Sequence, residues 1–265
     1  MSKKYYLLFI FGLFIYCADE KNPVTPDTDE IVIQGYLYAN KPVTDIKITT
    51  LALFDKPKTQ RPVNDALVIL NKNGLDYNLF LSPGDSGYYS YTGGDLTVLP
   101  GDSFRLNVTY NGKTASATTV VPEAPEFIFI SNDTLWLQPY YKFMSDSNRI
   151  TFKWTILDTN YCKLILHIRP EFESRWEYTI TQTSRGYQYF DADWSRNELV
   201  LKFNRFYEEG FYKVLLTRIN KEYYYFLNNM EIINSKKPDY YSNVNNGYGI
   251  FTAFNSDSCW IYFKK

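Results

Sequence analysis

The 265-residue chain carries 28 basic and 29 acidic residues, so its formal net charge is −1. This balance excludes the broad basic surface with which nucleic-acid-binding proteins neutralise phosphates. The chain is rich in aromatic residues, with 25 Tyr, 19 Phe and 5 Trp. Aromatic side chains pack well on a pleated sheet, and the length exceeds that of one small sandwich. We therefore predict a mainly β protein with two domains.

The N-terminal segment has the pattern of an export signal. A basic pair at residues 3–4 precedes an apolar and aromatic run at residues 5–16. This run is well short of the ~20 residues that a membrane-spanning helix needs. The run ends at Cys17, after which the composition turns acidic and polar. The arrangement resembles a bacterial lipoprotein signal, in which the cysteine is acylated. An uncleaved signal anchor and an ordinary secretion signal are the alternatives.

We expect residues 1–16 to form a lipoprotein signal peptide and residues 17–30 a lipidated tether, extended by its two prolines. Acyl chains on Cys17 would contribute roughly 0.8 kcal/mol per buried methylene and hold a folded domain at a bilayer. The acidic pair at residues 19–20 resembles the export tag of Bacteroidota surface lipoproteins. The expected location is therefore the outer membrane, at the cell surface.

Residues 31–122 show short strand patterns separated by turn dipeptides. Asn73-Gly74 and Asn111-Gly112 are typical of tight hairpin turns, and Leu99-Pro100-Gly101-Asp102 marks another reversal. Seven strands at this spacing predict an Ig-like or transthyretin-like β-sandwich. We expect these strands at residues 31–37, 46–53, 62–70, 77–81, 88–91, 104–110 and 113–121.

Residues 123–265 are expected to form a second β-rich domain. The apolar spacing changes to three- and four-residue steps at about residues 220–234, which predicts one amphipathic helix with Asn220 as its N-cap. The predicted fold class is thus mainly β, with two tandem antiparallel β-sandwich-like domains and one helix near the C-terminal end of the second. We expect further strands at residues 127–130, 150–156, 162–168, 178–182, 199–203, 211–217 and 259–263.

Two cysteines remain after Cys17. In an oxidising envelope compartment Cys162 and Cys259 could form a disulfide, and two separate buried thiols are an equally good alternative. No Cys/His spacing suggests a metal site, and no motif indicates a cofactor.

Three features of the sequence, the second made of two patterns, are similar to the motifs of a known family. They are VIQGYL at residues 32–37, the strand and turn patterns VNDALV at 63–68 and LPGDSFRLNV at 99–108, and SNVNNGYGIF at 242–251. Together they resemble a Bacteroidota lipoprotein family named domain of unknown function 4249. The resemblance implies an outer-membrane lipoprotein in a family often associated with TonB-dependent receptors. It implies no reaction and no catalytic residue.

The last of these stretches contains four residues that we expect to form a structural loop. Gly247 and Gly249 permit a sharp turn, and Phe251 enters a core beside a loop that includes Asn243. A loop that binds a ligand or a partner is the alternative.

The residues with catalytic or metal-binding potential do not combine into one candidate site. The one histidine, His167, lies in an apolar strand, and no nucleophile motif accompanies it. Acidic pairs at residues 171/173, 191/193 and 208/209 are more typical of solvated loops than of a calcium or glycosidase site. We therefore expect a protein without enzymatic activity.

Aromatic residues near loops are the best candidates for binding. Trp176 and Trp194 could stack on sugars or contribute to a protein interface. The leading hypothesis is a non-enzymatic envelope lipoprotein that binds a nutrient or a partner beside an outer-membrane transporter. A surface glycan-binding module is the alternative, followed by an envelope hydrolase. The expected partners are a membrane, through Cys17, and a transporter, without nucleic acid.

Overall fold

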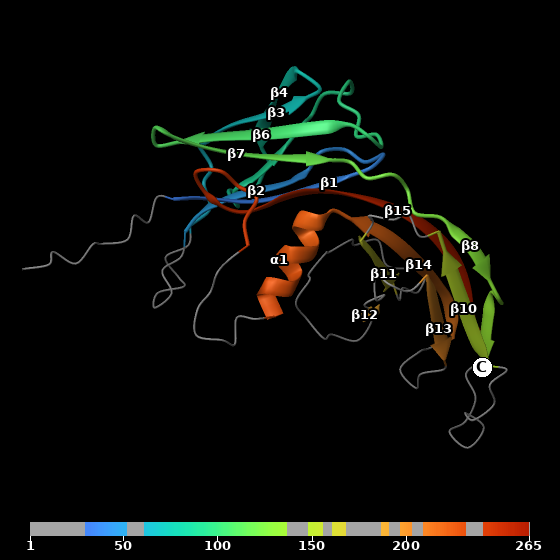
Figure 1. Ribbon diagram of the computed structural model, residues 1–265. Coiled ribbons are helices and arrows are strands. Elements are labelled where there is room, and N and C mark those ends of the chain that lie inside the picture. The colour runs from blue at the N-terminus through green and yellow to red at the C-terminus, as the bar shows by residue number, and fades with distance from the viewer. Residues whose placement is uncertain are drawn as a thin grey trace, which may run out of the picture.

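The computed structural model describes residues 30–51, 61–136, 148–155, 161–167, 187–190, 197–202, 209–231 and 241–264 (Figure 1). These residues form a 12-stranded sheet, a separate three-stranded sheet and one helix. The predicted fold class, mainly β with sandwich-like sheets and one helix, is confirmed.

The first half of the chain contains seven strands near the expected positions. They are β1 (Ile31–Tyr38), β2 (Asp45–Thr50), β3 (Leu67–Lys72), β4 (Leu75–Leu81), β5 (Tyr88–Ser90), β6 (Ser103–Tyr110) and β7 (Lys113–Val120).

The second half contains eight strands and the helix. They are β8 (Phe127–Ile130), β9 (Thr134–Trp136), β10 (Arg149–Trp154), β11 (Tyr161–His167), β12 (Tyr187–Phe190), β13 (Glu198–Lys202), β14 (Gly210–Ile219), α1 (Lys221–Glu231) and β15 (Tyr248–Lys264). Strands β9 and β12 were not expected, and the strand predicted at residues 178–182 lies outside the described residues. The predicted strand 259–263 is only the end of β15, which is far longer.

The large sheet runs in the order β12-β11-β14-β15-β1-β2-β5-β4-β3-β6-β7. Its β3, β4, β6 and β7 part folds over β1, β2 and the first half of β15, which gives the first sandwich (Figure 1). The pattern of β1 explains this packing. Its residues alternate between buried and half-buried positions, so one face of the strand points into the sandwich. The inward side chains include Ile31, Ile33 and Leu37, and they share one core with Phe104 and Leu106 of β6.

The C-terminal loop closes the first sandwich. The backbone of Ser116 in β7 exchanges two hydrogen bonds with Asn245, with N–O distances of 3.0 and 2.7 Å. Strand β15 then pairs in parallel with β1, from Val32 opposite Tyr248 to Tyr38 opposite Phe254. The sandwich thus includes a strand that the predicted division at residue 122 places in the second domain. The division into two folding units stays a prediction.

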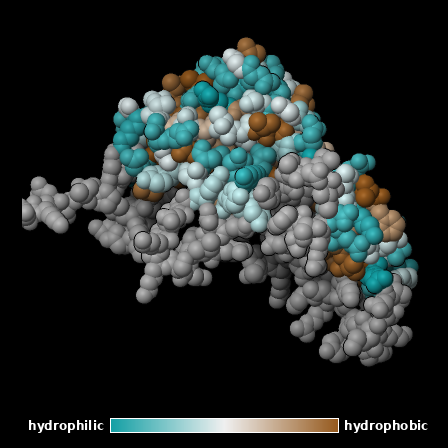
Figure 2. Space-filling view, viewed as in Figure 1, coloured by the Kyte–Doolittle hydropathy of each residue, from teal (hydrophilic) through white to brown (hydrophobic). Residues whose placement is uncertain are grey.

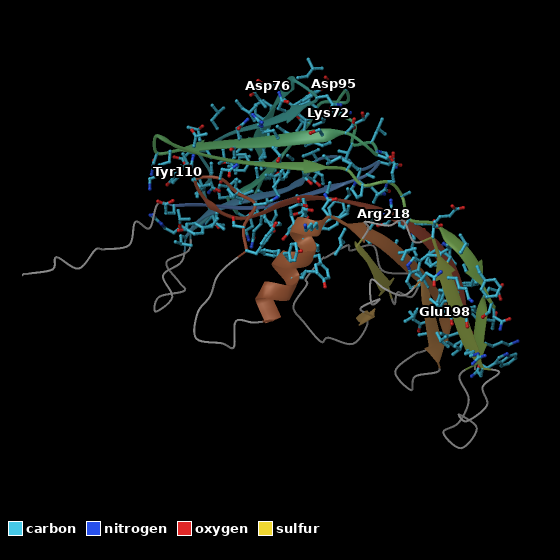
Figure 3. The ribbon with its side chains drawn as sticks, viewed as in Figure 1. Lys72, Asp76, Asp95, Tyr110, Glu198 and Arg218 are labelled. Atoms are coloured by element: carbon cyan, nitrogen blue, oxygen red, sulfur yellow. The ribbon has the colours of Figure 1, made fainter. Side chains whose placement is uncertain are left out.

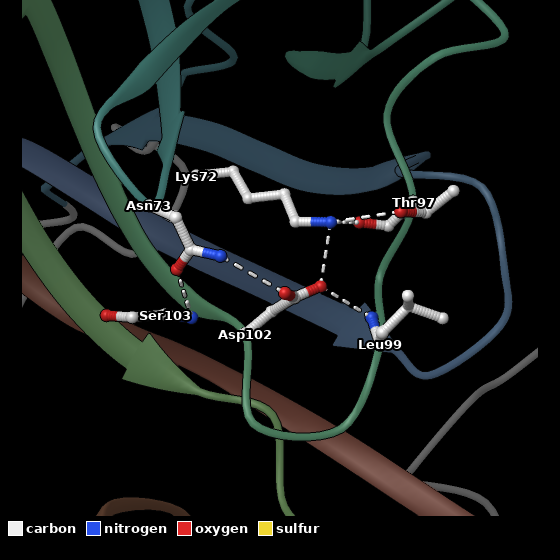
Figure 4. A network of polar contacts seen from close by, with 6 residues as sticks. All are labelled: Lys72, Asn73, Thr97, Leu99, Asp102 and Ser103. Atoms are coloured by element: carbon white, nitrogen blue, oxygen red, sulfur yellow. Dashed lines mark hydrogen bonds and ion pairs between the residues drawn. The ribbon is translucent and has the colours of Figure 1, made fainter.

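A polar network fixes the turn at Asp102 (Figure 4). Asp102 Oδ2 lies 2.8 Å from Lys72 Nζ and accepts a hydrogen bond from Leu99 N, while Asn73 Nδ2 donates to Oδ1. Lys72 Nζ also donates to Thr97 O at 2.7 Å. Burial raises the pKa of Asp102, but the bond from Lys72 and the other bonds outweigh burial, so the pKa is lowered overall. The expected turn is therefore tied to the β3–β4 hairpin.

Strand β15 continues beyond the first sandwich into a second core. It pairs with β14 over residues 255–263, and the β13-β10-β8 sheet covers one face of this pair (Figure 1). The buried side chains include Phe152 and Trp154 from β10, Tyr212 from β14 and Phe263 from β15. Alternate residues of β14 and β15 point into this core, so the residues between them point to the opposite face of the sheet.

A buried arginine lies where β15 passes from the first core to the second (Figure 3). Arg218 of β14 pairs with Asn255 of β15 and is only 2 % exposed. Its Nε and Nη2 atoms make no hydrogen bond within the described part of the chain. Asn255 Nδ2 donates to Pro122 O at 2.9 Å and so attaches the linker between the two parts to the strand.

Helix α1 packs on the face of β1 and β15 that points away from the first core. Tyr223 is buried against Phe254, with ring centroids 4.9 Å apart, and Ile219 and Ile250 complete this third cluster. Asn220 precedes the helix, and its carbonyl accepts a hydrogen bond from Tyr224 N. Its side chain donates to Thr119 Oγ1 and Val120 O, so it attaches the start of the helix to β7. No helix among the described residues is long and apolar enough to cross a membrane.

The disulfide considered from the sequence is not formed, because Cys259 is a free thiol. Cys162 in β11 pairs with Arg218, whereas Cys259 pairs with Val214 on the other side of β14. This register separates the two Cα atoms by about 10 Å across the sheet and about 13 Å along it. A disulfide requires Cα atoms within about 7 Å. The pairing of strands therefore excludes the bond.

Candidate functional site

An exposed strip of aromatic and lysine side chains covers the far end of the large sheet. It consists of Trp136 from β9, Phe211 and Lys213 from β14, and Trp260, Tyr262 and Lys264 from β15. We call these six residues the aromatic strip. Trp260 is 55 % exposed, Phe211 50 % and Trp136 44 %, although all lie in regular strands.

Strand register places the six residues on one face. Lys213 pairs with Trp260, Phe211 pairs with Tyr262, and Trp136 pairs with Lys264 in the parallel β9–β15 ladder. Residues that are directly opposite across a ladder share a face, as do residues two apart along a strand. The opposite face carries the second core, which holds the strands in place beneath the strip.

The rings and cations of the strip contact one another. Phe211 and Tyr262 have ring centroids 4.8 Å apart. Lys264 Nζ lies 4.5 Å from the Trp136 ring centroid, and Lys213 Nζ lies 5.9 Å from that of Trp260. An ammonium above an aromatic ring is attracted by the negative charge of the ring face. The strip therefore combines apolar ring area with two positive charges.

Tyr262 connects the strip to an acidic residue. Its hydroxyl donates a hydrogen bond to Glu209 Oε1 at 3.1 Å. Partial burial and this bond to a carboxylate raise the pKa of Tyr262 above its usual value, so the hydroxyl stays protonated at neutral pH. Glu209 is one member of the acidic pair at residues 208/209 considered from the sequence.

A shallow depression of about 450 Å³ lies elsewhere, on the outer face of the three-stranded sheet. Its lining includes Phe129, Arg149, Lys153 and Glu198, and none of the described lining residues is a histidine or cysteine. Glu198 is already paired with Lys153 at 2.9 Å. Figure 2 shows hydrophobic surface along the β8 side of this region, where Phe129 is exposed. Among the described lining residues, Lys153 and Glu198 are the one pair that could act as acid and base, and they are bonded to each other.

The four loop residues singled out in the sequence lie together at the start of β15. Asn243 Nδ2 donates to Phe251 O at 2.7 Å, and Phe251 N donates to Asn243 Oδ1 at 3.0 Å. Gly249 has a φ of +106°, and a side chain there would meet the backbone oxygen of Ile33. A Cβ at Gly247 would come within 2.8 Å of Ile31 O. All four residues thus fit the start of β15 against β1.

The remaining residues named from the sequence fall partly outside and partly inside the described part of the chain. Cys17, Trp176 and Trp194 lie outside the described residues. The backbone of His167 lies in β11, opposite Lys213. Burial, followed by the nearby Asp257 carboxylate, raises the pKa of the half-buried Cys259 thiol to about 11, which makes it a poor nucleophile. Among the described residues, no group of three potential metal ligands occurs.

Sequence reasoning missed the aromatic strip. A signal existed in the segment Cys259–Phe263, where Trp260 and Tyr262 alternate with Ile261 and Phe263. Such alternation in a sheet covered on one side predicts that one pair is buried and the other exposed. The pairing of this strand with β14 and β9, which assembles the strip, is not visible in the segment itself.

Comparisons with known proteins place the chain in a family. No curated protein matches it. Among solved structures it is similar to the FN1–FN3 domains of chicken CNTN1, with 12% identity, coverage of 89% of this chain and 67% of that chain, and a TM-score of 0.30. At this TM-score the likeness supports no inference. The family model described as "Domain of unknown function (DUF4249)" matches residues 19–259. Because this match spans most of the sequence, the chain belongs to the DUF4249 family.

Proposed function

We propose that the protein is a non-enzymatic binding lipoprotein of the cell envelope, which holds a ligand beside an outer-membrane transporter. The observation that carries the binding role is the aromatic strip. Three of its aromatic residues are 44–55 % exposed on regular strands, although apolar side chains of this size normally lie inside. Aromatic surface of this kind is enriched where proteins bind their partners.

The lipid anchor is supported by the export-signal pattern that ends at Cys17. An acylated cysteine followed by a polar tether would leave the folded part free to face a neighbouring transporter. In the described depression the Glu198 carboxylate is paired with Lys153 at 2.9 Å, which fits a binding role better than acid–base catalysis. A role beside a transporter is what the family resemblance implies.

Metabolic labelling tests the anchor. Cells fed a labelled fatty acid should incorporate the label into the wild-type chain and not into Cys17→Ser. Crosslinking of intact membranes, followed by purification of the tagged chain, should recover an outer-membrane transporter with wild type and much less with Cys17→Ser. An unlabelled wild-type chain would exclude the anchor, and a labelled chain without a transporter would exclude the accessory role alone.

A further inference from the structure

From the aromatic strip we infer that the ligand of this protein is an acidic polysaccharide, which lies across the strip and is held by stacked rings and paired lysines. This inference rests on the proposed binding role and names its ligand class. The first step concerns shape. The strip is a sheet face, and the depression found among the described residues lies on the other sheet. A flat surface suits an extended polymer better than a small molecule, which needs a concave pocket.

The second step concerns length. Trp260 and Lys264 are four residues apart on β15, which is about 13 Å in an extended strand, and β14 adds a neighbouring row about 5 Å away. A ligand that reaches Trp260, Tyr262 and Trp136 must therefore be longer than one sugar ring. Each added contact also raises the affinity of a linear polymer, because neighbouring units are already held close.

The third step concerns the rings. The face of an aromatic ring carries negative charge, and the C–H face of a pyranose is weakly positive and apolar. Sugars therefore stack on exposed Trp, Tyr and Phe rings. The strip has four rings, of which Trp136 and Trp260 each have a lysine ammonium over one face. Tyr262 adds a hydroxyl, already fixed by Glu209, that can accept a hydrogen bond from a sugar hydroxyl.

The fourth step concerns charge. Lys213 and Lys264 carry positive charge within the strip, and Glu209 is bonded to Tyr262 at its border. The ammonium groups lie over rings and keep donors available on the side away from the ring. Lysine is depleted from the cores of protein–protein interfaces, so two lysines among the rings argue against a protein partner. Carboxylate or sulfate groups along a sugar chain fit this charge pattern.

Isothermal titration calorimetry on the detergent-purified full chain tests the inference. The probes are polygalacturonate and chondroitin sulfate, with dextran as a neutral polymer and single-stranded oligothymidine as an aromatic-binding polyanion. We expect binding to at least one acidic polysaccharide, and weaker binding to dextran and to oligothymidine. Trp260→Ala should weaken binding at least tenfold. Lys213→Gln should weaken binding to the acidic polymer about threefold and leave binding to dextran unchanged.

Phe129→Ala is the matched control, because Phe129 is an exposed strand aromatic outside the strip. It should bind as wild type does, and all three variants should keep the wild-type thermal midpoint. The inference is overturned if neither acidic polymer binds, if Trp260→Ala binds as Phe129→Ala does, or if oligothymidine binds more tightly than both acidic polymers. In each of these cases fatty-acid labelling and transporter capture would still report separately on the proposed lipoprotein role.

Discussion

The two halves of strand β15 lie in different environments. From Ile250 to Asn255 every residue is buried, because the first core covers one face and α1 covers the other. From Ser256 to Lys264 the inward residues lie against the second core or its border, and the outward ones are exposed or half-buried. One continuous strand thus has a purely structural half and a half with a free face. Trp260 and Tyr262 can be large and aromatic because no neighbouring layer of the described residues has to accommodate them.

The two halves of β15 also differ in what determines their residue types. In the first half, the residue types are dictated by close packing, as at Phe251, whose ring would lie within 2.7 Å of a Cβ at Gly35 in the paired strand β1. In the second half, the inward residues Ile261 and Phe263 are dictated by the core, while the outward residues are not. Substitutions in the two halves should therefore differ sharply in their effect on stability.

Gly249→Ala should have the largest effect. The residue has a φ of +106°, and an added Cβ would meet the Ile33 backbone oxygen in the paired strand β1. A side chain at positive φ costs about 1–2 kcal/mol, and parting two paired strands adds to this. We expect the free energy of unfolding, measured by urea titration, to fall by at least about 3 kcal/mol.

Gly112→Ala is the control for this change. Gly112 also has a positive φ of 74°, but nothing lies within 4 Å of its Cβ position. The control should cost only about 1–2 kcal/mol, which is the conformational part alone. Equal losses for the two variants would show that the close approach of β15 to β1 does not constrain position 249.

Asn243→Asp should have the next largest effect. Asn243 both donates to Phe251 O and accepts from Phe251 N, and an ionised carboxylate can only accept. The carboxylate would face the Phe251 carbonyl, so we expect a loss of about 2 kcal/mol at pH 7. The loss should shrink at acidic pH, because a protonated carboxyl group regains a donor.

Asn246→Asp is the matched control in the same loop, since Asn246 is exposed and has a φ of 54° that aspartate also tolerates. It adds the same charge without removing the paired bonds, and its cost should stay below about 0.5 kcal/mol. A comparable loss in both variants would assign the effect to loop charge instead of to the hydrogen bonds of Asn243.

Local sequence predicted the hairpins well because their determinants are local. Asn111 and Gly112 have φ values of 47° and 74°, as the expected tight turn requires. The length of β15 was not predicted, because the polar residues Ser256, Asp257 and Ser258 interrupt its apolar pattern. Asp257 nevertheless contributes to the fold, because its Oδ2 accepts a hydrogen bond from Phe127 N, which lies 130 positions away in the chain. A partner at that separation leaves no trace in a local window.

The aromatic strip could not be predicted from local sequence, for a related reason. Alternation around Trp260 shows that one face is exposed, but it does not show that Phe211 and Trp136 lie beside it. That arrangement depends on β14 pairing antiparallel and β9 pairing parallel with the same strand. The cysteines show the same limit, because compartment and count left a disulfide and two separate thiols open, and only the strand register excludes the disulfide.

Arg218→Met should have the smallest effect, and the opposite sign. Arg218 lies at the boundary between the two halves, is 2 % exposed, and leaves Nε and Nη2 without hydrogen bonds. Replacing a buried charge that has two unbonded nitrogens with an apolar side chain of similar length removes a desolvation cost. We expect the free energy of unfolding to rise by about 1 kcal/mol, whereas Arg105→Met on the exposed face of β6 should change it by less than about 0.5 kcal/mol. A loss of more than about 2 kcal/mol for Arg218→Met would mean that the guanidinium is paired in solution. The boundary between the two halves would then be held by an ion pair and not by packing alone.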